Sequence, residues 1–131
     1  MIYLHTSALL RLIHQGAEGL ALGEWLNERC TEVILTSVIS EVELTHTLRR
    51  TQPDQVPQIP ALLAKISTYE VDELVRRVAA GTPDATLSSA LHVATALVVL
   101  GAQAQAFVTY DPAVARTATL ARLPVVTVPT E

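Results

Sequence analysis

The sequence predicts an α/β fold, in which helices cover both faces of a mainly parallel central sheet in three layers. Short apolar runs rich in β-branched residues alternate along the chain with segments whose apolar residues recur at helical spacing. Strands and helices that alternate in this way are typical of parallel sheets with right-handed crossovers. With 131 residues, 50% of them hydrophobic, the chain has the length and composition of a single domain over 1–131.

The first strand is expected at Ile2-Tyr3-Leu4, because it is a short apolar run that a polar cluster, His5-Thr6-Ser7, brings to an end. An apolar helical pattern then covers 7–15. Ligands of open α/β sheets bind outside the carboxyl ends of the strands, so this polar cluster lies where a site is expected. Alternatively, Thr6 or Ser7 serves only as the N-cap of the helix, and the two roles are compatible.

The rest of the chain continues the alternation of strands and helices. Helical spacing over 20–26 is followed by a strand at 32–35, and Thr36-Ser37 then opens a helix. Three prolines make 51–60 the clearest loop. The remaining expected elements are, in order, a helix from 61, a short strand at 67–71, helices at 73–80 and 86–100, a strand at 106–110, a helix at 113–120 and a strand at 123–128.

Composition excludes some classes of function. The apolar stretch 90–102 is short and is interrupted by His92 and Thr95, so we expect no membrane span, and no signal peptide is visible. One cysteine, Cys30, cannot form an internal disulfide, which fits a cytoplasmic protein. The net charge of −4 gives weak electrostatic support for nucleic-acid binding, although the pairs Arg49-Arg50 and Arg76-Arg77 offer local phosphate contacts.

Polar residues follow several of the predicted strands, and the ends of parallel strands converge on one crevice. Two of these residues are carboxylates, Glu43 and Asp111, which together could hold a divalent cation. A few oxygen ligands completed by water suit Mg²⁺ or Mn²⁺, and such a cation can activate water against a phosphodiester. Thr109 could place its hydroxyl toward the cation or the phosphate, or it is only a β-favouring residue at a strand end.

Four short motifs in this order resemble the PIN-domain family, and most closely the VapC-type toxins of toxin–antitoxin pairs. The motifs are 2–9 (Ile-Tyr-Leu-His-Thr-Ser-Ala-Leu), Thr36-Ser37 with Glu43-Leu44, 87–96 (Leu-Ser-Ser-Ala-Leu-His-Val-Ala-Thr-Ala) and 107–111 (Phe-Val-Thr-Tyr-Asp). The resemblance covers nearly the whole chain. It implies a PIN-like fold, a Mg²⁺- or Mn²⁺-dependent endoribonuclease acting on RNA, a VapB-like antitoxin partner and a homodimer.

The family has four acidic positions, and this chain keeps two of them. By the resemblance, Glu43 matches the second and Asp111 the fourth, whereas His5 stands at the first and Ser89 at the third. Losing two negative charges at contact range removes roughly 4 kcal/mol per close pair before solvation corrections. We therefore expect weak binding of Mg²⁺. A site of His5, Glu43 and Asp111 would favour Mn²⁺ or a softer cation such as Zn²⁺, because imidazole suits those ions better.

These substitutions leave two functions open: a weakened or altered nuclease, with catalytic candidates Glu43, Asp111, His5, Ser89 and Thr109, and an inactive PIN-fold module that binds an antitoxin-like partner. Each residue also has a structural alternative. Asp111 is a candidate cap of the helix that starts at Pro112, and Ser89 a candidate helix N-terminal residue. His92 is expected to be a hydrogen-bonded core histidine rather than a catalytic one.

Overall fold

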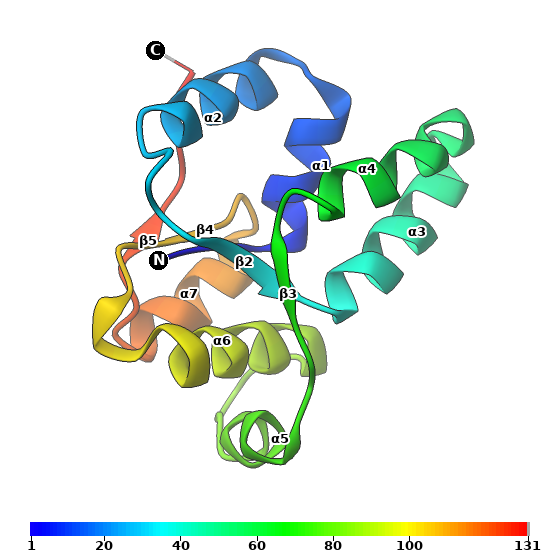
Figure 1. Ribbon diagram of the computed structural model, residues 1–131. Coiled ribbons are helices and arrows are strands. Elements are labelled where there is room, and N and C mark those ends of the chain that lie inside the picture. The colour runs from blue at the N-terminus through cyan, green and yellow to red at the C-terminus, as the bar shows by residue number, and fades with distance from the viewer. Residues whose placement is uncertain (131) are drawn as a thin grey trace.

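The computed structural model describes residues 1–130, and its centre is a sheet of five parallel strands in the order β3-β2-β1-β4-β5 (Figure 1). Strand β1 lies in the middle and pairs with β2 on one side and β4 on the other. Ile2 therefore faces Ile34 in one neighbour and Ala106 in the other. The strands are β1 (Ile2–Leu4), β2 (Ile34–Ser37), β3 (Ser67–Tyr69), β4 (Ala106–Val108) and β5 (Val125–Val126).

The seven α-helices of the described residues cover the two faces of the sheet, which confirms the three-layer α/β/α architecture (Figure 1). Helices α1 to α4 lie on one side, and α6 and α7 lie on the other, with α5 packed against α6. The helices are α1 (Thr6–His14), α2 (Ala17–Asn27), α3 (Ile39–Thr51), α4 (Ile59–Leu63), α5 (Glu73–Ala80), α6 (Leu87–Leu100) and α7 (Pro112–Leu120).

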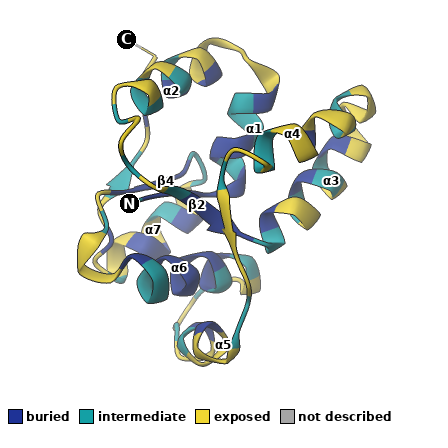
Figure 2. Ribbon diagram, in the orientation of Figure 1, coloured by how far each residue is buried: buried dark blue, intermediate teal, exposed yellow. Residues whose placement is uncertain are grey.

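Side-chain alternation along β1 separates the two main cores. Ile2 and Leu4 pack with residues of α1 to α4, whereas Tyr3 between them points to the opposite core of α6 and α7. All three side chains are fully buried, which is typical of a central strand covered on both faces. Burial also differs between the outer elements: Figure 2 shows that α6 is largely buried, whereas α5 and strand β3 are mostly exposed.

The segment predicted as a loop at 51–60 is the main difference from the sequence analysis. It contains a 3₁₀-helix at Pro53–Gln58 that leads directly into α4 at Ile59. Pro53 and Pro60 stand in first turns, where the missing N–H has no intrahelical acceptor, so the prolines favour short helices here. The predicted strand at 67–71 is present as β3, and the second strand lies two residues later than 32–35.

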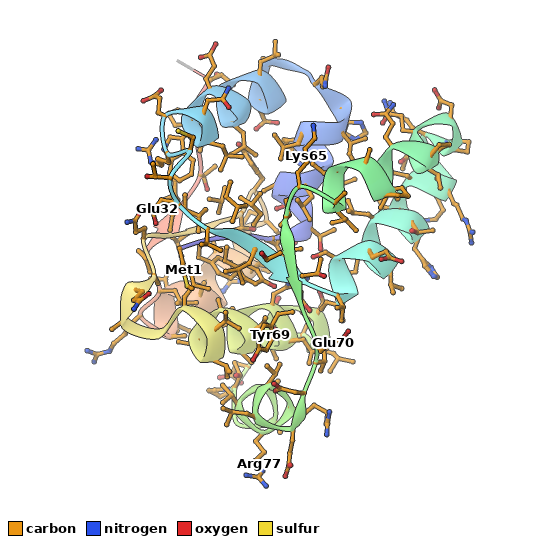
Figure 3. The ribbon with its side chains drawn as sticks, in the orientation of Figure 1. Met1, Glu32, Lys65, Tyr69, Glu70 and Arg77 are labelled. Atoms are coloured by element: carbon orange, nitrogen blue, oxygen red, sulfur yellow. The ribbon has the colours of Figure 1, made fainter. Side chains whose placement is uncertain are left out.

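The N-terminal ammonium of Met1 and the carboxylate of Glu32 form an ion pair of 2.7 Å at the start of the sheet (Figure 3). This pair holds β1 beside the loop that enters β2. No helix within residues 1–130 is long and apolar enough to cross a membrane.

Candidate active site

A pocket of about 270 Å³ opens at the carboxyl ends of β1 and β4, where α6 and α7 begin. The two carboxylates predicted to share a site, Glu43 and Asp111, both line it. So do His5 and Ser89, whereas Thr109 is fully buried beneath the pocket. The complete lining of this pocket is His5, Thr6, Ser7, Leu10, Glu43, Thr47, Thr86, Ser88, Ser89, Asp111, Ala113 and Val114. Two larger pockets beside α4, of about 440 and 390 Å³, contain none of these residues.

Three donors hold the carboxylate of Glu43, which α3 presents to the pocket. One oxygen, Oε1, accepts from the hydroxyl of Thr6 and from Nε2 of His92, both at 2.6 Å. The other, Oε2, accepts from the hydroxyl of Ser88 at 2.5 Å. Partial burial alone would raise the pKa of Glu43, but these hydrogen bonds, led by that of His92, bring the pKa down to about 2. Glu43 is therefore a charged and well-oriented carboxylate at neutral pH.

His92 connects Glu43 to the opposite core. Its Nδ1 lies 2.7 Å from the hydroxyl of Tyr3, and its Nε2 contacts Glu43. Burial raises the pKa of Tyr3, so the phenol keeps its proton and can donate it to Nδ1. With the phenol on one ring nitrogen and the carboxylate on the other, His92 links Tyr3 to Glu43. His92 is fully buried and hydrogen-bonded, as predicted, and in addition it orients a residue of the pocket.

His5 caps helix α1 and belongs to a second network. Its Nδ1 accepts the backbone N–H of Ser7 at 3.2 Å and lies 2.9 Å and 3.1 Å from the hydroxyls of Ser7 and Thr109. The Ser7 hydroxyl accepts the N–H of Tyr110, and that of Thr109 accepts the N–H of Asp111. Burial, with the nearby His92, lowers the pKa of His5 to about 3, so its ring is neutral.

Asp111 is the N-cap of α7, as predicted. Its Oδ1 accepts the backbone N–H groups of Ala113 and Val114, at 2.9 Å and 3.3 Å. The second oxygen, Oδ2, has no hydrogen-bond partner within residues 1–130. Capping and ligand binding are thus compatible, because one oxygen fixes the side chain and the other stays available.

Ser89 and its neighbour Ser88 have different roles. Thr86 is the N-cap of α6, where its hydroxyl accepts the backbone N–H of Ser89 and bonds the hydroxyl of the same residue. Ser89 is therefore a helix N-terminal residue. Ser88, which was not among the catalytic candidates, binds Glu43 directly. The sequence shows both serines at this helix start, but only the helical phase reveals which one faces α3.

The donor set fits a weakly held divalent cation. Glu43 and Asp111 supply two carboxylates to one pocket, and water could complete a shell of oxygen ligands. Within residues 1–130, His5, Glu43 and His92 form a compact group, because one ligand atom of each lies within 4.8 Å of the other two. Asp111 is not part of this group, so the predicted trio of His5, Glu43 and Asp111 shares a pocket without forming one compact cluster.

Comparisons with known proteins agree with the geometry. No protein-family model matches the chain. The chain is 41% identical over 114 residues to "Ribonuclease VapC35" of Mycobacterium tuberculosis (strain ATCC 25618 / H37Rv), which spans 85% of this chain and 84% of that protein. It is 35% identical over 116 residues to "Ribonuclease VapC47" of M. tuberculosis (strain CDC 1551 / Oshkosh), spanning 85% of each.

A solved structure has the same fold. It is the crystal structure of VapBC2 from Rickettsia felis bound to a DNA fragment from the promoter of the pair. The match has a TM-score of 0.71 and covers 97% of this chain and 98% of that one, at 15% sequence identity. At this low identity the likeness concerns the fold alone, and it is consistent with the parallel sheet order described above.

Proposed function

The chain belongs to the VapC family of PIN-domain ribonuclease toxins, and we propose that it is a divalent-metal-dependent endoribonuclease. The observation that supports this most is the common pocket of Glu43 and Asp111. By the resemblance, these two residues are the acids that the chain keeps from the family pattern. The hydrogen bonds to Glu43 keep its carboxylate charged, whereas those to Asp111 occupy one oxygen and leave the other free. A cation bound there would activate water and stabilise the charge of the phosphodiester transition state.

The residues around the cation have separate tasks. Glu43 and Asp111 would hold it, with water in the remaining positions. Thr6, Ser88 and His92 keep Glu43 ionised and fixed in orientation. Thr109 and Ser89 act less directly, because Thr109 supports His5 and the backbone of Asp111 while Ser89 completes the start of α6. Mn²⁺ is expected to bind better than Mg²⁺, since only two carboxylates remain.

The test combines calorimetry with an RNA-cleavage assay on the purified protein, each with Mg²⁺ and with Mn²⁺. Glu43→Gln and Asp111→Asn are expected to lower Mn²⁺ affinity at least tenfold and to abolish cleavage. Glu41→Gln is the matched control, because Glu41 is an exposed glutamate of the same helix that does not line this pocket. Cleavage that persists unchanged in Asp111→Asn would contradict this assignment of the site.

A VapB-like antitoxin is the proposed partner, by analogy with the VapBC2 complex. The second candidate function, an inactive module that only binds such an antitoxin, is favoured by the replacement of two acids by His5 and Ser89. The two functions differ in one result. If the wild-type protein binds the antitoxin but neither takes up Mn²⁺ nor cleaves RNA, the binding module is correct.

A further inference from the structure

The hydrogen bonds of His5 fix which of its ring nitrogens carries the proton. A backbone N–H always keeps its hydrogen, so the N–H of Ser7 requires a lone pair on Nδ1 of His5. The two hydroxyls beside Nδ1 already accept the N–H groups of Tyr110 and Asp111, and each still has its own proton to donate. Nδ1 has a single lone pair, which these donors share, and the two hydroxyls also lie 3.2 Å from each other, so one can donate to the other. In this arrangement Nδ1 is an acceptor, which leaves the proton of the neutral ring on Nε2.

This protonation state makes His5 a poor metal ligand. Coordination requires a free lone pair, but that of Nδ1 is used in capping α1 and Nε2 carries hydrogen. To bind a cation through Nε2, the ring would have to move its proton to Nδ1, where it would face the N–H of Ser7 and break the cap. The side chain that replaces the family's first acid therefore presents a donor, where a carboxylate would present only acceptors.

The Nε2–H group has no acceptor within the described part of the chain. No hydrogen bond to this atom is formed by residues 1–130, although 95% of His5 is buried. Nε2 of His5 is nevertheless accessible from outside the core. Among these residues, Tyr110 Oη is the one side-chain polar atom that is both fully buried and without a partner, so Nε2, which also has no partner, is not fully buried. His5 lines the pocket of Glu43 and Asp111, so this donor is open to whatever enters it.

We propose that His5 is a substrate-binding residue that donates its Nε2–H to a non-bridging phosphate oxygen of the RNA, beside a cation held by Glu43 and Asp111 alone. This inference rests on the proposed function and assigns the residue that receives the scissile phosphodiester. A neutral donor suits the task, because a phosphate oxygen accepts charge-assisted hydrogen bonds and the two carboxylates of the pocket cannot provide one. Replacing an acid by histidine thus exchanges one metal contact for one substrate contact.

The test separates metal binding from phosphate binding. His5→Asn keeps a side-chain oxygen in reach of the Ser7 N–H but removes the part of the ring that carries Nε2. Mn²⁺ affinity of this variant is measured by calorimetry. RNA affinity is measured by fluorescence anisotropy, in EDTA, with a labelled mixed-sequence RNA oligonucleotide. In the RNA-binding measurement, the protein with His5 and the His5→Asn variant both also carry Asp111→Asn, which prevents cleavage and removes one negative charge that repels the RNA. His14→Asn is the control, since His14 is an exposed histidine at the far end of α1.

The expected result is an Mn²⁺ affinity within about twofold of the wild type and an RNA affinity about tenfold weaker, as for the loss of one hydrogen bond to a charged acceptor. Two-bond ¹H–¹⁵N correlation spectra of the wild-type protein should show hydrogen on Nε2 and a bare Nδ1. A loss of Mn²⁺ affinity in His5→Asn, an unchanged RNA affinity, or hydrogen on Nδ1 would each overturn the inference. None of these results would contradict the nuclease function itself, which depends on Glu43 and Asp111.

Discussion

Tyr3 and His92 are 89 positions apart in the chain, yet the phenol oxygen of one lies 2.7 Å from Nδ1 of the other. Tyr3 stands in the central strand and His92 in α6, so this bond fastens the sheet to the helix that carries Ser88 and Ser89. The other ring nitrogen of His92, Nε2, contacts Glu43, so the imidazole links Tyr3 to that carboxylate. A residue of the hydrophobic core thereby determines how a pocket carboxylate is held.

Replacing Tyr3 by Phe tests this connection. The ring would keep its stacking on Phe107, at 5.0 Å between centroids, but Nδ1 of His92 would lose its hydrogen-bond partner inside the core. We expect the free energy of unfolding in urea to fall by about 1–3 kcal/mol, the cost of leaving a buried polar atom without its hydrogen bond. Tyr69→Phe is the control, because Tyr69 is partly exposed on β3 and should change stability by less than about 0.5 kcal/mol. Equal losses in the two variants would show that the Tyr3–His92 bond contributes little.

Stability should depend on pH through His5. Its pKa falls from 6.5 to about 3 on burial, so below 6.5 the unfolded chain binds a proton that the native chain does not. The resulting stabilisation is fully present above pH 6.5 and is lost as the pH falls toward 3. Urea titrations should show wild type losing about 1–2 kcal/mol relative to His5→Asn between about pH 7 and pH 5. Parallel pH profiles for the two proteins would contradict this expectation.

Restoring the family's acids should strengthen cation binding. In His5→Asp with Ser89→Asp the pocket would hold four carboxylates, which repel one another without metal and bind it tightly when it is present. We expect a lower melting temperature than wild type in EDTA, a larger rise on adding Mn²⁺, and faster RNA cleavage. Thermal unfolding with and without Mn²⁺ measures the first two. Identical cleavage rates in the double variant and the wild type would show that the two replacements did not weaken the site.

Packing between α1 and α2 depends on a glycine. A Cβ atom added at Gly19 would lie 2.0 Å from the backbone oxygen of Arg11, so the helices would have to separate. Gly19→Ala should destabilise the protein by about 2–3 kcal/mol. Gly23 lies in the same helix with nothing within 4 Å of its added Cβ, and Gly23→Ala should stabilise by about 0.5–1 kcal/mol. Thermal unfolding of both variants checks the pair, and a stable Gly19→Ala protein would contradict the close approach.

Much of this architecture could be predicted because local patterns determine it. The polar residues after β1 and β4 follow apolar runs, so the positions of His5 and Asp111 at strand ends come directly from the alternation of strands and helices. Pro112 after Asp111 predicted both the cap and the start of α7. The family resemblance then indicated Glu43, which no local pattern distinguishes from Glu41.

Contacts between distant elements could not be predicted in the same way. Whether Ser88 or Ser89 reaches Glu43 depends on the rotation of α6 against α3, and a difference of one residue turns a side chain by a quarter of the helix circumference or more. His92 was expected to be buried and hydrogen-bonded, but its two partners come from β1 and α3. The state of His5 depends on three backbone N–H groups that assemble only in the folded chain.

The order of the strands has a consequence during translation. Strand β1 leaves the ribosome first but must wait for β4 to occupy its other edge, since Ile2 pairs with Ala106. Asp111 emerges later still, directly behind β4. A nascent chain that already displays Glu43 thus cannot complete the pocket until β4 and the residues directly behind it have also been synthesised.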